Sequence, residues 1–197
     1  MTDEFAAVTE IHIHEDEWGM RCLHPLEAAA EVAADLLAAE AASRANRAPD
    51  GVGWTDVHVI AAPADDYAAA GLTFAQADAA LTPIMPRIRR FVATASAGFT
   101  EGVEDPMGSY EDDAYCYGVD ASCFVKLDGE EPLVEQIWYQ ADTEDPARLD
   151  RLRRAIIAVD RLVPSVIADY RLDCTGSVGD GEFLDRYMRM LDQEYED

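Results

Sequence analysis

The chain has 197 residues, 49% of them apolar and 9% aromatic, and its 40 acidic and 15 basic residues give a net charge of −25. This apolar share excludes a disordered chain, and the charge disfavours binding to nucleic acid or to anionic membranes. No apolar run reaches the roughly 18–20 residues of a membrane span. The N-terminus carries acids where a secretory signal carries Lys or Arg. We therefore expect one domain over residues 1–197, located in the cytoplasm.

The four cysteines, Cys22, Cys116, Cys123 and Cys174, form no CxxC pair and are too sparse for a disulfide framework. We interpret them as reduced, mostly buried thiols. A cysteine–histidine nucleophile pair stays open, since no local signature distinguishes one cysteine from another. The sequence contains no GxSxG, P-loop or GxGxxG motif.

The first third of the chain predicts a long helix between two strands. Residues 8–14, VTEIHIH, alternate strictly between apolar and polar side chains and predict a half-buried strand. Residues 24–48 predict a helix with Pro25 near its first turn and an apolar stripe on one face. The sequence PDGVG ends this pattern, and residues 54–62, WTDVHVIAA, predict the second strand.

The middle of the chain is less regular. Thr73 followed by Gln76 forms a capping box and predicts a short helix. Residues 83–91, PIMPRIRRF, indicate a second helix with two prolines near its start, whereas the overlapping residues 89–99 favour a strand. Residues 100–113 predict a long loop by their composition.

The last part of the chain carries the clearest local signals. Residues 121–140, ASCFVKLDGEEPLVEQIWYQ, predict a β-hairpin that turns at DGEEP. Asp145 as N-cap with Pro146 behind it predicts a helix, residues 165–173 predict a strand, and Asp180 caps a final helix. Together these elements predict a single α+β domain, in which a mostly antiparallel sheet packs against several helices.

Histidines alternate with isoleucines in the first predicted strand. His12 and His14 project on one face, and His58 has the same relation to its flanking valines in the second strand. If these strands are neighbours, three imidazoles and a carboxylate from the following acidic segment supply the ligands for zinc or iron. This HxH element resembles the metal-binding strand of amidohydrolases and of cupins. The chain is short for a (β/α)₈ barrel, and an edge strand with one polar face accounts for the same residues.

Acids gather in two segments that also contain aromatic residues, one directly after the first strand and one in the loop at 100–113. We predict that the partner-binding residues are Glu15, Asp16, Glu17, Trp18, Asp105, Tyr110, Glu111, Asp112 and Asp113. In this interpretation the carboxylates steer a basic partner and the aromatic rings supply buried contact area. The alternative is that Trp18, Met107 and Tyr110 fill the core while the carboxylates face solvent.

In its size, its acidity and its lack of catalytic motifs, the chain resembles the immunity proteins that bacteria keep beside polymorphic toxins. The resemblance implies a non-enzymatic protein without a cofactor, which binds a basic toxin or enzyme and occludes its active site. The alternative is a metal-dependent hydrolase or oxygenase that uses zinc or iron at His12, His14 and His58. A third possibility is a scaffold that forms a homodimer and needs no further partner.

Overall fold

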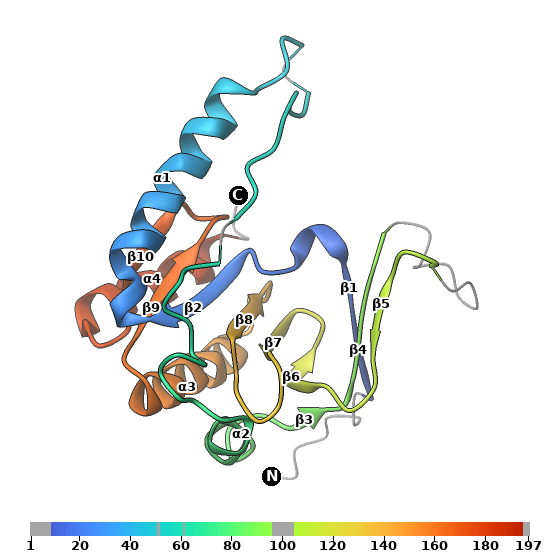
Figure 1. Cartoon of the computed structure of the whole chain (residues 1–197), viewed down its shortest axis with the longest axis vertical. Coiled ribbons are helices and arrows are strands. Elements are labelled where there is room, and N and C mark those ends of the chain that lie inside the picture. Colours follow the sequence, from blue (N-terminus) through green and yellow to red (C-terminus); the bar gives the residue numbers. More distant parts are fainter. Residues whose placement is uncertain (1–8, 51, 61, 96–104, 195–197) are drawn as a thin grey trace.

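The structure, a computed structural model, describes residues 9–50, 52–60, 62–95 and 105–194 and is drawn in Figure 1. The strands are β1 (Glu10–His14), β2 (Arg21–Pro25), β3 (Arg87–Ile88), β4 (Arg90–Thr94), β5 (Ser109–Glu111), β6 (Tyr115–Asp120), β7 (Cys123–Asp128), β8 (Gln136–Ala141), β9 (Ser165–Asp169) and β10 (Cys174–Ser177). The helices are α1 (Ala29–Ala45), α2 (Phe74–Leu81), α3 (Pro146–Leu162) and α4 (Gly181–Gln193), with short 3₁₀ turns η1 (Glu15–Glu17) and η2 (Leu26–Ala28). The predicted α+β class is confirmed.

The strands form two sheets. The larger has seven strands in the order β10-β9-β2-β8-β7-β6-β3, and each neighbouring pair runs antiparallel. The smaller has the order β1-β4-β5, with β1 parallel to β4 and β4 antiparallel to β5. The predicted hairpin is confirmed as β7 and β8, joined by the turn that contains DGEEP.

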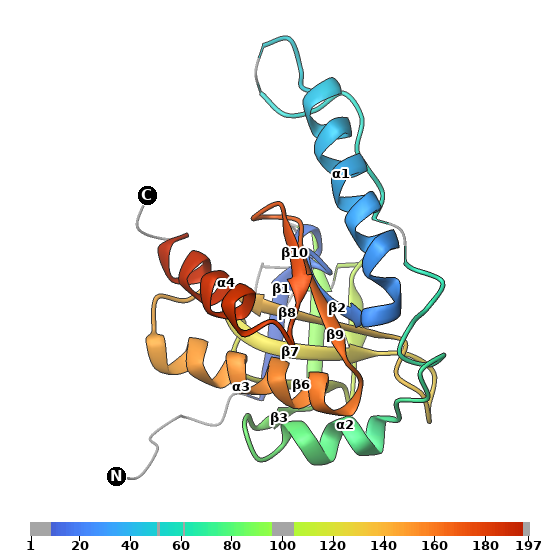
Figure 2. The same ribbon diagram turned by 90° about the vertical axis from the view of Figure 1, so that its left-hand side faces the viewer.

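The large sheet is covered on both faces (Figure 2). Helices α2, α3 and α4 pack on one face and form the main hydrophobic core with every second side chain of the strands, such as Val125 and Tyr139. On the other face the small sheet packs over β7 and β8, where Phe91 contacts Phe124 and Trp138. The beginning of α1 covers β9 on that same face.

The helix starts follow the local signals in the sequence. The Thr73 hydroxyl accepts from the Gln76 backbone N–H, and the Gln76 side chain accepts from the Thr73 N–H, which completes the capping box of α2. The carboxylate of Asp145 accepts from the Ala147 N–H at the start of α3. The Asp180 carboxylate caps α4 in the same way. These three predicted helices are confirmed.

Two predicted elements are wrong. Residues 54–62 are not a strand, because in their described part only Trp54 forms a bridge, to Arg47, and the segment runs beside α1 where no strand offers a partner. Residues 83–91 contain β3 and the start of β4 instead of a helix, since Pro86 lacks an N–H and disfavours helical backbone before it.

Besides β3, three strands lie where no strand was predicted. β2 lies where the helix at 24–48 was expected to begin, so α1 starts only at Ala29. β5 occupies part of the predicted loop at 100–113, of which residues 100–104 lie outside the described residues. β10 lies in the glycine-containing stretch before Asp180, and there Gly176 is needed because a Cβ would lie 2.5 Å from the Phe183 ring. No helix in the described ranges combines the length and the apolar character needed to cross a membrane.

Candidate functional site

The three histidines of the predicted metal site lie in different surroundings. His12 and His14 project on the same face of β1, as expected, while the alternating isoleucines are buried. The His12 Nε2 hydrogen-bonds with the Thr94 hydroxyl at 2.6 Å, and the His14 Nδ1 accepts from the Asp16 N–H at 3.2 Å. His58 contacts α1, where its Nε2 lies 2.9 Å from the Asp35 carboxylate.

The adjacency of the two histidine segments, on which the predicted metal site depends, is therefore not found among their described residues. β1 pairs with β4, and the segment that carries His58 lies along α1. Within the described parts of the chain, no three His, Cys, Asp or Glu side chains are placed so that they could hold a metal ion. The zinc or iron site at His12, His14 and His58 remains a prediction that this arrangement does not favour.

The nine predicted partner-binding residues fall into two groups at opposite ends of the small sheet. η1 follows directly after His14, which is in register with Thr94 at one end of β4. Glu111 is in register with Phe91 near the other end. The Asp105 carboxylate accepts from the Ala95 N–H, so this residue belongs with the η1 end. The two acidic segments therefore do not form one continuous surface.

Asp105 and Tyr110 hold the turn before β5. Asp105 is only 5% exposed, and its carboxylate accepts from the N–H groups of Ala95 and Met107, each at 2.9 Å. The Tyr110 hydroxyl accepts from the Asp105 N–H at 2.8 Å, while Tyr110 is 39% exposed. These contacts give both side chains a role in shaping the turn, and Met107 beside them is exposed.

The acids at 111–113 are engaged in ion pairs within the chain. Glu111 pairs with the buried Lys126 at 2.8 Å, Asp112 with Arg90 at 2.9 Å, and Asp113 with Arg89. In the free chain, these ion pairs already neutralise part of the negative charge of the three acids. Substitution of these acids would also disturb the small sheet. Arg90 belongs to β4 of that sheet, and Lys126 lies beneath it in β7.

The acids of η1 are the least engaged of the predicted set. Glu15 and Asp16 are exposed, Glu17 is partly exposed, and neither Glu15 nor Glu17 makes an ion pair with another described residue. Trp18, which follows them, is half-buried and stacks on Trp138 with ring centroids 5.7 Å apart. Trp18 therefore fixes the acidic turn to the core, as the core-filling alternative expected, while the carboxylates face solvent.

A cleft that the sequence did not reveal lies beside β2. Cys22 and His24 project from the same face of this strand and line a cleft of about 310 Å³ together with Trp18, Asp66 and Glu135. The Cys22 thiol donates to the Gly19 carbonyl at 3.0 Å. His24 also lines a neighbouring hollow, where the Asp35 carboxylate accepts from the Tyr170 hydroxyl at 2.7 Å.

The electrostatics of this cleft do not favour nucleophilic chemistry. Burial raises the pKa of the Cys22 thiol to about 12, and the carboxylates of Asp169 and Asp128 act in the same direction. Burial lowers the pKa of His24 to about 4, against the opposing effect of Asp35. Both groups are uncharged near neutral pH, so they do not form the thiolate–imidazolium pair of an activated cysteine. Burial raises the pKa of the other three thiols as well.

The low pKa of His24 predicts a loss of stability in mild acid. Between pH 6.5 and pH 4 the unfolded chain binds a proton at this residue that the folded chain does not bind, so the free energy of unfolding falls as the pH falls. At about 1.4 kcal/mol per pKa unit, and allowing for partial exposure, the loss is about 1–3 kcal/mol. The charged and titratable residues that line the two hollows with His24 are Cys22, Glu31, Asp35, Asp66, Glu135 and Tyr170.

The test compares urea unfolding of the wild type and of the His24→Gln variant at pH 7 and pH 4.5. We expect a smaller drop in the free energy of unfolding for the variant, since it lacks the imidazole. A His14→Gln variant controls for the removal of a histidine elsewhere. Equal drops in the wild type and the His24→Gln variant would show that His24 does not stay neutral in the folded chain.

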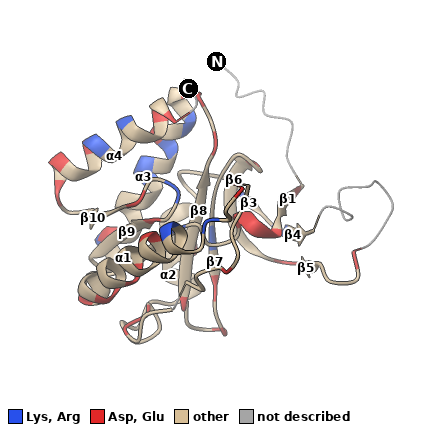
Figure 3. Ribbon diagram, turned by 90° about the horizontal axis from the view of Figure 1, so that it is seen from above, with Lys and Arg blue, Asp and Glu red and all other residues tan. Residues whose placement is uncertain are grey.

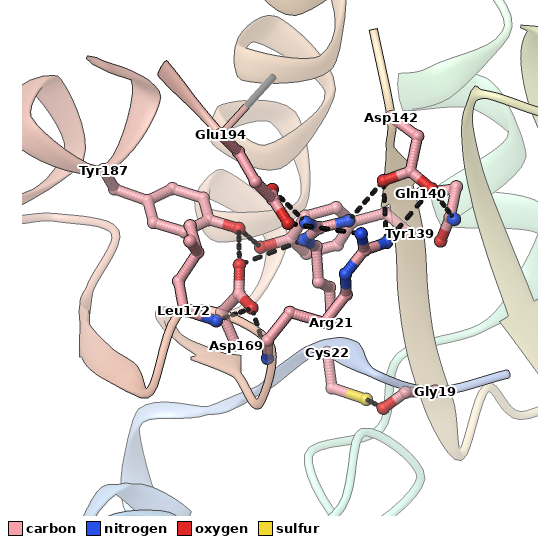
Figure 4. A network of polar contacts seen from close by, with 11 residues as sticks. Gly19, Arg21, Cys22, Tyr139, Gln140, Asp142, Asp169, Leu172, Tyr187 and Glu194 are labelled. Atoms are coloured by element: carbon pink, nitrogen blue, oxygen red, sulfur yellow. Dashed lines mark hydrogen bonds and ion pairs between the residues drawn. The ribbon is translucent and has the colours of Figure 1, made fainter. Parts of the chain in front are cut away.

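The opposite face of β2 carries a buried ionic network (Figure 4). The Arg21 side chain is fully buried and donates to Asp169 at 3.0 Å, to Asp142 at 2.9 Å and to Glu194. The Tyr187 hydroxyl donates to the same Asp169 carboxylate at 2.8 Å. Burial opposes the charge on Arg21, yet these acids outweigh it and raise its pKa above the ordinary value. The network joins β2, β9 and α4, and the side chains of Arg21 and Asp169 at its centre are fully buried.

Comparison with protein-family models, with curated proteins and with solved structures finds no match to this chain. The charges, contacts and exposed surfaces of its own residues are thus the basis for a functional proposal.

Proposed function

We propose that this chain is a non-enzymatic, acidic protein-binding protein of the immunity or antitoxin kind, which binds a basic toxin or enzyme and blocks it. The observation that carries the proposal is the surplus of carboxylates that remains after internal ion pairing. Its 40 acids face 15 bases, and the bases that make ion pairs between described residues include Arg21, Arg44, Arg87, Arg89, Arg90, Lys126, Arg148, Arg153, Arg154 and Arg171. A basic partner is the complement of such a surface.

The distribution of charge supports the same proposal. Seven of the 15 basic residues lie on α3 and α4, and Figure 3 shows acids on these two helices as well as on the other elements. On α3 and α4 the arginines alternate with acids, as in the pairs of Arg154 with Asp150 and Arg153 with Asp185. A strongly acidic surface accelerates encounter with a cationic protein and keeps copies of the chain apart.

The first test uses the genes beside this one. Each neighbouring product is expressed in a host cell with and without this chain, and growth is followed. We expect one basic product to arrest growth, and this chain to restore growth and to co-purify with that product. The proposal is wrong if no neighbouring product is both toxic and bound.

The acids of η1 provide a quantitative prediction about association. Replacing Glu15, Asp16 and Glu17 by Ser is expected to slow association with the basic partner by about 3- to 10-fold at low salt and to reduce its salt dependence. Stopped-flow or biosensor kinetics at several salt concentrations measure both quantities. This triple variant is preferred to one at residues 111–113, because it leaves the ion pairs of Lys126 and Arg90 intact.

A matched control removes the same charge elsewhere. Glu130, Glu144 and Glu182 are exposed on other parts of the surface, and their replacement by Ser changes the net charge equally. If both triple variants slow association to the same degree, only the total charge matters and η1 has no particular role. An unchanged association rate in the η1 variant would contradict its place in the interface.

A further inference from the structure

One part of the molecule stands away from the rest. Helix α1 projects beyond the sheets, and residues 46–50 and 52–60 return alongside it (Figures 1 and 2). The buried residues of α1 are Val32 and Leu36 in its first half, and from residue 37 to residue 60 no described residue is buried. We refer to residues 37–50 and 52–60 as the arm.

The arm carries most of the strongly exposed large apolar side chains of the described chain. They are Leu37, Val52, Trp54, Val57 and Val59, with exposed fractions between 61% and 79%. Scattered single apolar residues are normal on a surface, but a group of this kind on one projecting element is typical of a protein–protein contact. We call these five residues the arm patch.

The arm patch is held in place by polar contacts on its inner side. The Trp54 indole N–H donates to the carbonyl and hydroxyl oxygens of Ser43, each at 3.1 Å, so the ring is fixed while 61% of the residue stays exposed. The Thr55 N–H donates to the Asn46 carbonyl at 2.7 Å. The contact of His58 with Asp35 turns this residue toward α1 and leaves Val57 and Val59 facing solvent. A rigid, exposed Trp is the side chain most enriched at the centre of interfaces.

The charge of the chain decides which partner suits this surface. A second copy brings the same net charge of −25, so two copies repel each other. Anionic membranes are repelled for the same reason. The arm carries Glu40, Asp50 and Asp56 against Arg44 and Arg47, and the inner half of α1 adds Glu31 and Asp35, so acids outnumber bases here. A surface that combines cationic and apolar side chains complements both features.

We propose that the arm patch is the apolar contact through which this chain docks a basic protein, while the surrounding carboxylates select for cationic residues. This inference rests on the proposed function and adds the surface that the partner covers. It also separates two contributions: charge sets the rate of encounter, and burial of Trp54 and the valines slows dissociation.

Two synthetic peptides of equal length and charge test the inference on the full chain. One is an amphipathic helix with Leu at positions i, i+3, i+4 and i+7 and Lys on the opposite face, and the other has Ser in place of Leu. By fluorescence anisotropy we expect the wild type to bind the Lys/Leu peptide about tenfold or more tightly than the Lys/Ser peptide. A Trp54→Ser, Val57→Ser double variant should lose this preference and keep its affinity for the Lys/Ser peptide.

A matched double variant, Met107→Ser with Leu162→Ser, removes two exposed apolar side chains outside the arm and should keep the preference for the Lys/Leu peptide.

The inference is wrong if the wild type binds both peptides equally, or if the Trp54→Ser, Val57→Ser variant still prefers the Lys/Leu peptide. In either case, salt-sensitive binding of the Lys/Ser peptide would still support the proposed function, because it would show that the chain binds a basic partner through charge. If neither peptide binds, both proposals fail. A homodimer that the arm variant abolishes in sedimentation would assign the arm patch to a second copy and overturn the inference.

Discussion

The Arg21→Met variant is expected to lose about 3–5 kcal/mol of its free energy of unfolding. The reason is that Arg21 is the buried cation shared by Asp169, Asp142 and Glu194. Asp169 is itself fully buried, so removal of the guanidinium leaves a negative charge that water cannot solvate. The loss comes from this uncompensated charge rather than from missing volume, since Met fills much of the same space.

Arg171 provides the matched control for this prediction. It pairs with the same two carboxylates, Asp142 and Glu194, but its side chain is 33% exposed. The Arg171→Met variant should therefore lose only about 0–1 kcal/mol. Urea unfolding followed by circular dichroism measures both. If both variants lost the same free energy of unfolding, the buried ion pairs of Arg21 would contribute no more than the exposed ion pairs of Arg171. If Arg21→Met does not fold, Arg21→Lys keeps the charge without the planar fork and should give an intermediate loss.

The second large effect is expected at Lys126, the single lysine of the chain. Its side chain is 1% exposed and lies between Glu111 and Asp128, 2.8 Å from the former. Asp128 also accepts from the Trp138 indole N–H at 2.7 Å. Lys126 thus joins β5 of the small sheet to β7 of the large one. The Lys126→Met variant is expected to lose about 3 kcal/mol of its free energy of unfolding and to loosen the small sheet first.

The pH dependence of this contribution follows from the pKa of Lys126. Burial lowers this pKa, but Asp128 and Glu111 outweigh burial and raise it above the ordinary value. The stabilisation is therefore complete at neutral pH and is lost only as the pH rises through the folded-state pKa. Urea unfolding at pH 7 measures the loss, and hydrogen exchange in β1, β4 and β5 reports the loosening. Arg89→Met removes an exposed cation directly before β4 of the small sheet and should change little. The prediction fails if the two variants behave alike.

The candidate surface was only partly predictable from the sequence. The acidic turn at Glu15–Glu17 lies at the surface, as its composition indicated. Asp105 is buried in a turn, and Glu111 is tied to Lys126. Clusters of acids along the chain show where charge is abundant, but they do not show which carboxylates are already paired. The arm patch was missed because Val57 and Val59 alternate with polar residues, and this pattern predicts a buried strand face.

The sequence by itself determined the features that depend on neighbouring residues. The capping residues Thr73, Asp145 and Asp180 mark the starts of three helices, and the turn after β7 closes a hairpin. Such signals work because caps and tight turns satisfy backbone groups within a few residues. The α+β class follows from them.

The tertiary structure alone decided how the strands pair and which charges are buried. β2 is five residues long and lies between β8 and β9, and its last two residues fall in the stretch where the long helix was predicted to begin. Its pairing with β9 places Arg21 opposite Asp169. β1 pairs with β4, whereas His58 contacts Asp35 of α1. Strand partners are chosen by burial and hydrogen bonding between segments that are distant in the chain, and no local pattern encodes that choice.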